Sequence, residues 1–489
     1  MDIFHNHQIP FIALSIAAYI AGVLIGRFLY FRGLSALVIV RAVIHISGYK
    51  IVFSVWCVFF VWSNAEFIAN QEIFNMALTP DQVQIIKATV PILQQHGATI
   101  TTVFYKNMLD AHPELNTVFN TTNQVHGHQA RALAGALFAY AANIDNLGAL
   151  SPAVELICNK HASLYIQPDD YKIVGKYILE AMKEVLGDAL TPDILDAWAA
   201  AYWQLANLFI GREGDIYKQS EGWTQWREFR VASKVPESEE ITSFYLKPLD
   251  EKPLPSFRPG QYISVQVHVP DLQYPQARQY SLSDMPRSDY YRISVKKEIG
   301  LNTAEPEAKA HPGFVSNVLH GSINEGDVVK VSHPCGEFFL AEQGPASHPV
   351  VLVAAGVGLT PLTSMLNTLT SADSQRNIHF IHGARTTSVR AFKDQIQSRA
   401  QQLPNLRASF FTSSPSADEK QGVDYDYQGR IDLANLDGNK DLFLDNAQTQ
   451  YYICGPEAFM MEMAGGLKAR GVTSERVHME LFGSGGVPV

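Results

Sequence analysis

Cysteine is scarce in this chain of 489 residues, and no two cysteines form a Cys-x-x-Cys pair. The four lie far apart in the sequence, at Cys57, Cys158, Cys335 and Cys454. Zinc sites, iron–sulfur clusters and disulfide frameworks use closely spaced or paired cysteines, so the pattern argues against all three. Sparse, unpaired cysteine is typical of a protein that works in a reducing compartment.

Basic patches, internal repeats and low-complexity tracts are also missing. The formal net charge is −10, and no cluster of Lys and Arg offers a surface for nucleic acid. Hydrophobic residues make up 47% of the chain and charged residues 18%, which indicates folded domains with apolar cores rather than disorder. A chain of this length is expected to hold about three domains.

The N-terminal residues 1–75 differ from the rest. Residues 8–26 carry no formal charge, which is just enough for a bilayer-spanning helix of roughly 20 residues. A second uncharged run, 51–65, is shorter. No Lys or Arg precedes the first run and several follow it, so the positive-inside rule leaves the C-terminal side in the cytosol. Two spans would put the catalytic part outside, away from nicotinamide nucleotides, so one span is expected. A cleaved signal peptide fits poorly, because the positive n-region is missing.

Residues 76–217 show helical apolar spacing and no strand pattern, which predicts an all-α domain. Thr79, followed by Pro, Asp and Gln, is a helix start with a capping box, and Thr191 begins a similar start. Gln129 and Leu133 lie four positions apart and therefore share one helical face. His161 lies in another such segment, where a lone histidine is usually a packed or solvated side chain.

The surroundings of His161 change that expectation. Phe104-Tyr105, Val118-Phe119-Asn120 and His128-Gln129-Ala130-Arg131-Ala132-Leu133 precede it, and Tyr171 and Gly211-Arg212-Glu213 follow it. In this order and at these spacings the segments resemble the globin domain of a flavohaemoglobin. The resemblance implies that His161 is the axial ligand of a haem iron.

The same resemblance implies roles on the opposite side of the haem. Tyr105 and Gln129 are expected to donate hydrogen bonds to bound dioxygen, while Leu133 shapes the pocket and Phe119 wedges the macrocycle. The competing explanation is that these side chains fill a helical core, and for Leu133 it stays open.

On the histidine side, the resemblance implies a hydrogen-bonded relay from Tyr171 and Glu213 to the far nitrogen of His161. Such partners fix the ring and increase its donor strength. A stronger donor favours oxygen activation over oxygen storage.

Residues 222–341 contain short alternating segments separated by turn residues, which predicts a small antiparallel β-barrel. The expected strands are 229–231, 241–246, 261–269, 291–295 and 328–331. Two motifs stand out, the segment Arg-Pro-Gly-Gln-Tyr ending at Tyr262 and the segment Arg-Gln-Tyr-Ser beginning at Arg278. The second has the Arg-x-Tyr-Ser form of the flavin site in the ferredoxin-reductase family.

This resemblance implies an FAD site. Arg278 is expected to clamp the pyrophosphate through its forked donors. Tyr280 presents its ring to the isoalloxazine, and Ser281 a hydroxyl near the flavin nitrogen that accepts hydride. Ser316 lies in a segment expected to donate to the phosphates. Tyr262 and Gln279 complete the expected set.

Residues 348–489 alternate apolar strands (350–355, 378–381 and 451–453) with helices, as in a doubly wound α/β sheet. A glycine-containing turn follows the first strand, where backbone and helix N-terminus favour a pyrophosphate. The residues implied to bind the nicotinamide nucleotide or the flavin are Gly356, Val357, Gly358, Leu359, Thr360, Pro361, Cys454, Gly455, Pro456, Glu480, Leu481, Phe482, Gly483 and Ser484. Leu481 and Ser484 depart from the family's common Cys-Phe-Gly-Pro. Lys160 and Glu480 are expected between haem and flavin, where they tune both potentials.

The sequence therefore predicts a globin, an FAD-binding barrel and an NAD(P)-binding domain of the ferredoxin-reductase type. The function implied by the resemblance is that of a nitric oxide dioxygenase: NAD(P)H reduces FAD, FAD reduces haem b, and nitric oxide and oxygen become nitrate. The expected partners are these small molecules, with no nucleic acid or protein implied. Two alternatives stay open: reduction of lipid or alkyl hydroperoxides, and a non-enzymatic oxygen or nitric oxide sensor.

Two points are left open by the sequence. The preference between NADH and NADPH is one: Arg385, after the second strand of the last domain, could meet a 2′-phosphate, but an exposed arginine is the commoner explanation. The other is the role of residues 1–75, because the family normally begins near Met76. The extension is a membrane anchor, with association through residues 8–65, an organelle-targeting segment or an upstream translation artefact. The catalytic domains are expected in the cytoplasm.

Overall fold

The computed structural model describes residues 40–46, 49–55, 78–119, 127–270, 272–298, 313–341, 348–371 and 375–482. The chain divides into two compact units, Met1–Ala77 and Leu78–Val489. The described residues of the first unit form an antiparallel hairpin of β1 (Val40–Ile46) and β2 (Tyr49–Val55), which the sequence analysis did not predict. The uncharged run 8–26 lies outside the described residues. No helix within the described ranges is both long and apolar enough to cross a bilayer.

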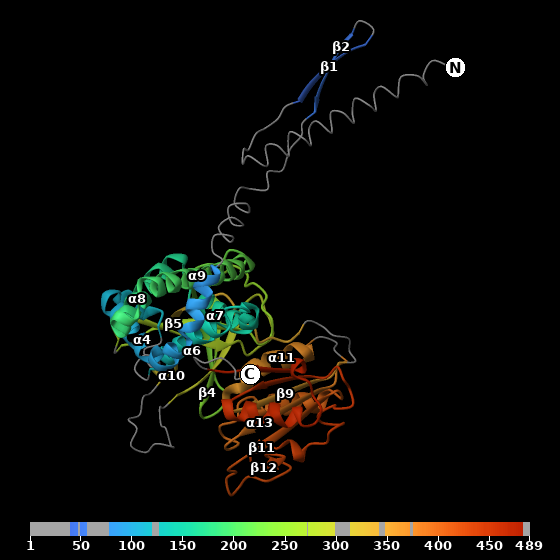
Figure 1. Cartoon of the computed structure of the whole chain (residues 1–489). Helices are drawn as coiled ribbons and strands as arrows, with labels where there is room; N and C mark the ends of the chain where they lie inside the picture. The colour runs from blue at the N-terminus through green and yellow to red at the C-terminus, as the bar shows by residue number, and fades with distance from the viewer. Residues whose placement is uncertain are drawn as a thin grey trace. The chain divides into compact units, whose positions relative to one another are not determined.

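The second unit begins with helices (Figure 1). They are α3 (Pro80–Ala88), α4 (Val90–Ala111), η1 (Pro113–Thr117), α6 (His128–Ala142), η2 (Leu147–Leu150), α7 (Ser151–Ser163), α8 (Pro168–Leu186), η3 (Gly187–Ala189) and α9 (Pro192–Gln219). The predicted capping box is confirmed, because Thr79 Oγ1 accepts the Gln82 N–H at 3.2 Å and Gln82 Oε1 accepts the Thr79 N–H at 2.9 Å. Fully buried side chains such as Ile100 and Phe104 of α4 pack with Ile178 of α8 in one core.

Six antiparallel strands follow, in the order β6-β5-β8-β3-β4-β7. Their bounds, with one helix, are β3 (Arg227–Pro236), β4 (Ile241–Pro248), β5 (Tyr262–His268), β6 (Pro275–Ser281), β7 (Tyr291–Lys296), α10 (Phe314–Gly321) and β8 (Val328–Val331). A bridge between Leu282 and Ile293 joins the two outer strands and closes the barrel. Ile263, Val265 and Val267 of β5 point into its core, as the alternating pattern predicted.

The C-terminal part is a parallel sheet in the order β12-β11-β10-β9-β13-β14. Its elements are β9 (Val350–Ala355), η4 (Gly356–Gly358), α11 (Leu359–Ser371), β10 (Ile378–Ala384), α12 (Lys393–Gln402), β11 (Leu406–Thr412), β12 (Tyr427–Gln428), η5 (Leu433–Asn435), β13 (Gln450–Cys454), α13 (Glu457–Lys468), η6 (Ser474–Arg476) and β14 (Val477–Glu480). Val350 and Leu352 pack with α11 and α12, while Val351 and Val353 pack with α13, so helices cover both faces. The strand order reverses between β9 and β13, where ligands bind in open α/β sheets.

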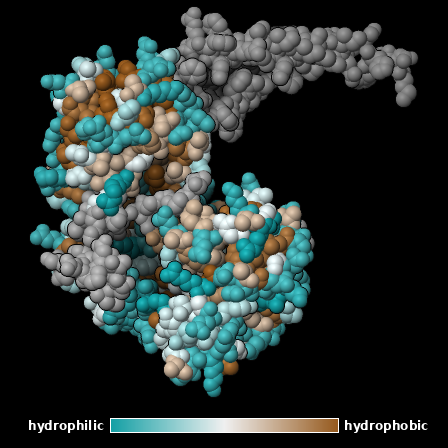
Figure 2. Space-filling model, turned by 60° about the horizontal axis from the view of Figure 1, so that its bottom comes forward, coloured by the Kyte–Doolittle hydropathy of each residue, from teal (hydrophilic) through white to brown (hydrophobic). Residues whose placement is uncertain are grey.

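The surfaces of these parts differ. Figure 2 shows hydrophobic residues gathered over the helical part, whereas hydrophilic residues cover most of the visible C-terminal sheet part.

A buried cluster joins the helical part to the barrel, with Cys158, Ala162 and Ile216 on one side and Tyr262 and Cys335 on the other. The two parts therefore share an apolar contact beside α7.

Candidate functional site

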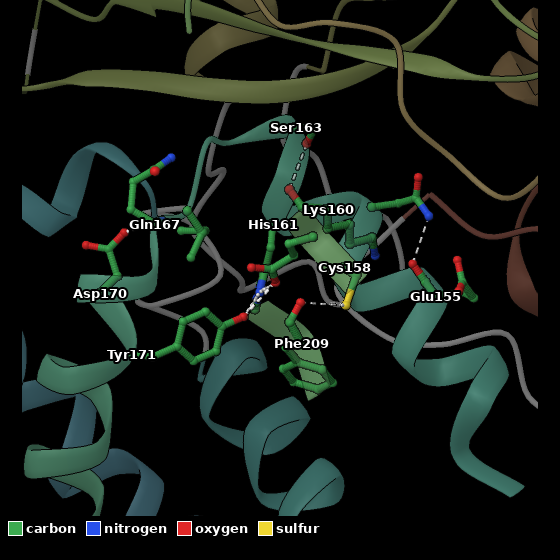
Figure 3. A network of polar contacts seen from close by, with 12 residues as sticks. Glu155, Cys158, Lys160, His161, Ser163, Gln167, Asp170, Tyr171 and Phe209 are labelled. Carbon is green, nitrogen blue, oxygen red and sulfur yellow. Dashed lines mark hydrogen bonds and ion pairs between the residues drawn. The ribbon is translucent and has the colours of Figure 1, made fainter. Parts of the chain in front are cut away.

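His161 lies near the end of α7 and meets side chains from two other helices (Figure 3). Its Nδ1 is 2.8 Å from Glu213 Oε1, on α9, and 3.0 Å from the hydroxyl of Tyr171, on α8. The Tyr171 hydroxyl also donates to Glu213 Oε1 at 2.6 Å. The structure thus brings together three residues that lie up to 52 positions apart in the sequence.

These contacts determine how His161 can act. Glu213 is 2% exposed and accepts two hydrogen bonds, which is the arrangement that a buried carboxylate requires. Burial, followed by the charge of Glu213, raises the pKa of Tyr171, so this hydroxyl stays a donor. The Nδ1 proton of His161 is therefore directed to Glu213. No described residue gives Nε2 a hydrogen-bond partner, and its lone pair is suited to a metal.

The residues expected on the opposite side come from α4, α6 and the segment that follows η1. The rings of Tyr105 and Phe119 meet edge to face, with centroids 5.5 Å apart. Burial raises the pKa of Tyr105, which keeps its hydroxyl protonated. Leu133 packs partly buried against the helical core, and Gln129 is partly buried in the first turn of α6.

Helix α7 is bonded to the barrel on both sides of His161. Asn159 Oδ1 accepts the N–H of Gly336 at 2.8 Å, and Ser264 Oγ donates to Ser163 Oγ at 2.9 Å. Figure 3 shows Ser163 at the end of the helix that faces the strands. Sequence reasoning missed both contacts, because their partners are 177 and 101 positions apart.

Lys160 faces two carboxylates at this contact, those of Glu480 and Glu337. Burial lowers the pKa of Lys160, and both carboxylates oppose that effect. Burial, followed by the charge of Glu337, raises the pKa of Glu480 to about 8, although Lys160 lowers it. Sequence reasoning placed Lys160 and Glu480 together but missed Glu337, which no motif marked.

The two flavin motifs lie side by side, because β5 pairs with β6 and Tyr262 is opposite Ser281. Arg278 Nη1 donates to Gln276 Oε1 at 3.1 Å and to the carbonyl of Ala277 at 2.7 Å, which fixes the guanidinium. Burial lowers the pKa of Arg278 to about 10, so it remains cationic at neutral pH.

The other expected flavin residues surround this pair. The Tyr262 hydroxyl is buried near Ser163, yet no described residue meets it in hydrogen-bonding geometry. Gln279 Nε2 lies 3.4 Å from Ser163 Oγ, and Tyr280 packs partly buried against the barrel core. Ser316, in the first turns of α10, accepts the N–H of Glu298 at 3.3 Å.

The expected nucleotide residues gather where the sheet order reverses. The turn 356–358 follows β9, and the start of α11 holds 359–361. Cys454 ends the neighbouring β13, and residues 455–456 follow it. A Cβ at Gly358 would lie 2.2 Å from the carbonyl oxygen of Cys454, so only glycine permits this approach. Phe482 is 44% exposed and Leu481 packs against the sheet, whereas Gly483 and Ser484 lie outside the described residues.

Two contacts near this turn were not predicted. The buried His382 lies with Nε2 3.0 Å from the carbonyl of Gly356, which has a φ of +55°. Burial lowers the pKa of His382 to about 3, so it is neutral and can donate to that carbonyl. Arg385 forms an ion pair with Glu240, from the loop before β4.

Comparisons with known proteins agree with this arrangement. Residues 102–208 match the globin family, and residues 352–465 match the family described as oxidoreductase NAD-binding domain. The flavohemoprotein of Bordetella parapertussis is 47% identical over 416 residues, which cover 84% of this chain and 100% of that protein. The chain belongs to the flavohemoprotein family.

Further comparisons extend the family assignment. The flavohemoprotein of Bacillus subtilis is 46% identical over 405 residues, covering 82% of this chain and 96% of that protein. A solved flavohemoglobin from Malassezia yamatoensis, with bound FAD and heme, matches at a TM-score of 0.71 and 29% identity, covering 83% of this chain and 100% of that one. The predicted fold classes, all-α, antiparallel barrel and doubly wound sheet, are confirmed, and the chain is an oxidoreductase.

Proposed function

We propose that this flavohemoprotein is a nitric oxide dioxygenase that uses haem b, FAD and NAD(P)H to convert nitric oxide and oxygen to nitrate. The observation that carries the proposal is the contact of His161 with Tyr171 and Glu213, in the same compact unit as the flavin and nucleotide motifs. An oxygen-storage globin has no need of a buried carboxylate behind its histidine. The proposal divides the catalytic part of the chain into the domains 76–217, 222–341 and 348–489 and assigns it to the cytoplasm.

The chain's residues suit a haem. His161 offers Nε2 to an iron because Nδ1 is held by Glu213, and that carboxylate increases the donor strength of the ring. When bound, the haem supplies the iron at which oxygen and nitric oxide react. Phe119 and Leu133 provide apolar walls, and Tyr105 and Gln129 provide donors that hold oxygen in place.

The barrel and the sheet suit the other two cofactors. Arg278 presents a fixed, cationic guanidinium to a pyrophosphate, and the enclosed Tyr262 hydroxyl can bond a ligand group. A Cβ at Gly356 would meet nothing within 4 Å, so the turn before α11 leaves its backbone open to a second pyrophosphate. In the proposal, the flavin accepts hydride between the nucleotide and His161. Lys160 and Glu480 are assigned to this path because their charges act on each other where α7 meets the rest of the unit.

The test is spectroscopic and kinetic. Purified full-length protein is expected to show a haem Soret band and flavin absorbance, and NADH should reduce both. Nitric oxide consumption with stoichiometric nitrate is the expected activity, and His161→Ala should abolish haem binding and this activity. A protein without haem, or one that turns over alkyl hydroperoxides but not nitric oxide, would contradict the proposal.

A further inference from the structure

Gln276 lies between the flavin motif and the helical part. It is on β6, its side chain is fully buried, and it contacts both sides through its one carboxamide. Its Nε2 donates to the carbonyl of Asn116 at 2.8 Å and lies 3.3 Å from the carbonyl of Phe119. Its Oε1 accepts from Nη1 of Arg278 at 3.1 Å.

The orientation of this amide follows from its partners. A guanidinium has only donors, so it must face the amide oxygen, and carbonyls have only acceptors, so they must face the amide nitrogen. A reversed amide would place like groups together at both ends. Because the group is buried, loss of either partner leaves a polar atom without water to replace it.

We propose that Gln276 is a positioning residue that couples FAD binding to haem retention, through Arg278 at one end and the backbone of Asn116 and Phe119 at the other. The inference rests on the proposed function, which places the FAD pyrophosphate at Arg278 and the haem against Phe119. It goes beyond that function, which assigns no role to the carboxamide of Gln276.

The physical route is short. A bound pyrophosphate restrains Arg278, and Arg278 restrains the oxygen of Gln276. The nitrogen of the same rigid group then holds the backbone that presents Phe119 to the haem. FAD therefore reduces the freedom of the segment that must move for haem to leave. Coupling between binding sites is reciprocal, so haem should tighten FAD binding by the same factor.

The experiment measures haem transfer from the full-length protein to an excess of apomyoglobin, at FAD concentrations from below to above saturation of the flavin site. In the natural protein, FAD is expected to slow haem loss by about fivefold or more, the lower end of typical allosteric coupling. Gln276→Met has a similar volume and lacks both hydrogen bonds, and its haem loss should not depend on FAD. A merely structural role would speed haem loss equally with and without FAD.

Two further variants make the test specific. Gln276→Glu keeps an acceptor for Arg278 but has no donor for Asn116, so it should also lose the dependence on FAD. Tyr165→Phe is the matched control: it removes another bond between the helices and the barrel, in which the Tyr165 hydroxyl accepts the His333 N–H at 3.0 Å. In this control, the rate of haem loss should still depend on FAD as it does in the natural protein.

The proposal is overturned if FAD does not slow haem loss in the natural protein, if both Gln276 variants keep the natural dependence, or if Tyr165→Phe loses it. Neither haem transfer nor FAD binding involves turnover. A protein that shows the coupling but consumes no nitric oxide would overturn the proposed function alone.

Discussion

In the proposed function, Glu213 is the residue that favours oxygen activation over oxygen storage. Its carboxylate is 2.8 Å from Nδ1 of His161, so Glu213→Gln replaces a charged acceptor by a neutral amide of the same shape. We expect haem to stay bound, the iron–histidine stretching frequency to fall, and nitric oxide consumption to fall by about 10-fold to 100-fold, as for other partners of metal ligands. Resonance Raman spectra and nitric oxide electrode traces measure the two effects.

Glu155→Gln is the control for that change. Glu155 lies on α7 with His161, but its carboxylate bonds Arg212 at 2.6 and 2.9 Å. Its removal should leave the iron–histidine frequency unchanged. Equal frequencies in Glu213→Gln and the natural protein would show that the carboxylate does not act on the ring.

Glu480 gives a prediction about pH. The residue is only partly exposed, and burial of its carboxyl raises the pKa from 4.5 to about 8. A carboxyl with a raised pKa binds its proton more tightly in the folded chain, so the free energy of unfolding falls as pH rises between these two values. Glu480→Gln removes this contribution. Chemical denaturation should show that the free energy of unfolding falls more between pH 6 and pH 8 in the natural protein than in Glu480→Gln.

The exposed Glu462 of α13 provides the comparison for that titration. Glu462→Gln should keep the natural loss of stability between the two pH values. If Glu480→Gln loses as much stability as the natural protein does, the carboxyl of Glu480 is not the group that titrates.

At the scale of elements, the meeting of α11 with β13 depends on Gly358. A Cβ there would lie 2.2 Å from the carbonyl oxygen of Cys454, so Gly358→Ala must separate the two elements. We expect a loss of about 1–3 kcal/mol in the free energy of unfolding, as for other overpacked sites, and weaker NADH binding. Urea denaturation and NADH titration measure these effects.

The same substitution at Gly465 should have the opposite effect. Gly465 lies within α13, and a Cβ there meets nothing within 4 Å. Because alanine is a better helix former, Gly465→Ala should stabilise the protein by up to about 1 kcal/mol. If both variants behave alike, steric approach at Gly358 does not explain its glycine.

Elements with strong local patterns were predictable from the sequence. The strands 328–331 and 350–355 match β8 and β9 residue for residue, and the capping box placed the start of α3. The alternation in β5 places its apolar residues on one face, but Ser264 on the other face is also buried, against Ser163. A strand covered by another domain cannot be recognised from its own alternation.

The residues of the candidate site divide in the same way. Those in short motifs such as Arg-Gln-Tyr-Ser could be singled out from the sequence, because the residues of such a motif are neighbours in the chain. Glu337, His382 and Gln276 were missed, because each acts through a partner that only the fold brings near. Gln276, for example, contacts the carbonyl of Asn116 from 160 positions away.

At the scale of the whole catalytic unit, the barrel and the sheet meet through Glu240 and Arg385. Glu240 directly precedes β4, and its carboxylate forms an ion pair with Arg385, which follows β10. A second oxygen of that carboxylate, Oε2, lies 3.7 Å from Nζ of Lys296. Arg385 is the residue placed to meet a 2′-phosphate, but here it is held by a carboxylate that also repels phosphate. The arrangement predicts a preference for NADH over NADPH.

Glu240→Gln tests this preference. Without the carboxylate, Arg385 is released to a 2′-phosphate, so the KM for NADPH should fall several-fold while the KM for NADH stays within about twofold, since a charge-assisted hydrogen bond contributes about 1.5–3 kcal/mol before the cost of ordering the side chain. The adjacent, exposed Glu239 is the matched control: its backbone N–H donates to the carbonyl of Ser388, and its carboxylate has no ion pair with any residue that the structure describes. Glu239→Gln should change neither KM. A natural protein that prefers NADPH would show that Glu240 does not withhold Arg385 from the nucleotide. A Glu240→Gln variant with unchanged KM for both nucleotides would show that Arg385 does not bind the 2′-phosphate.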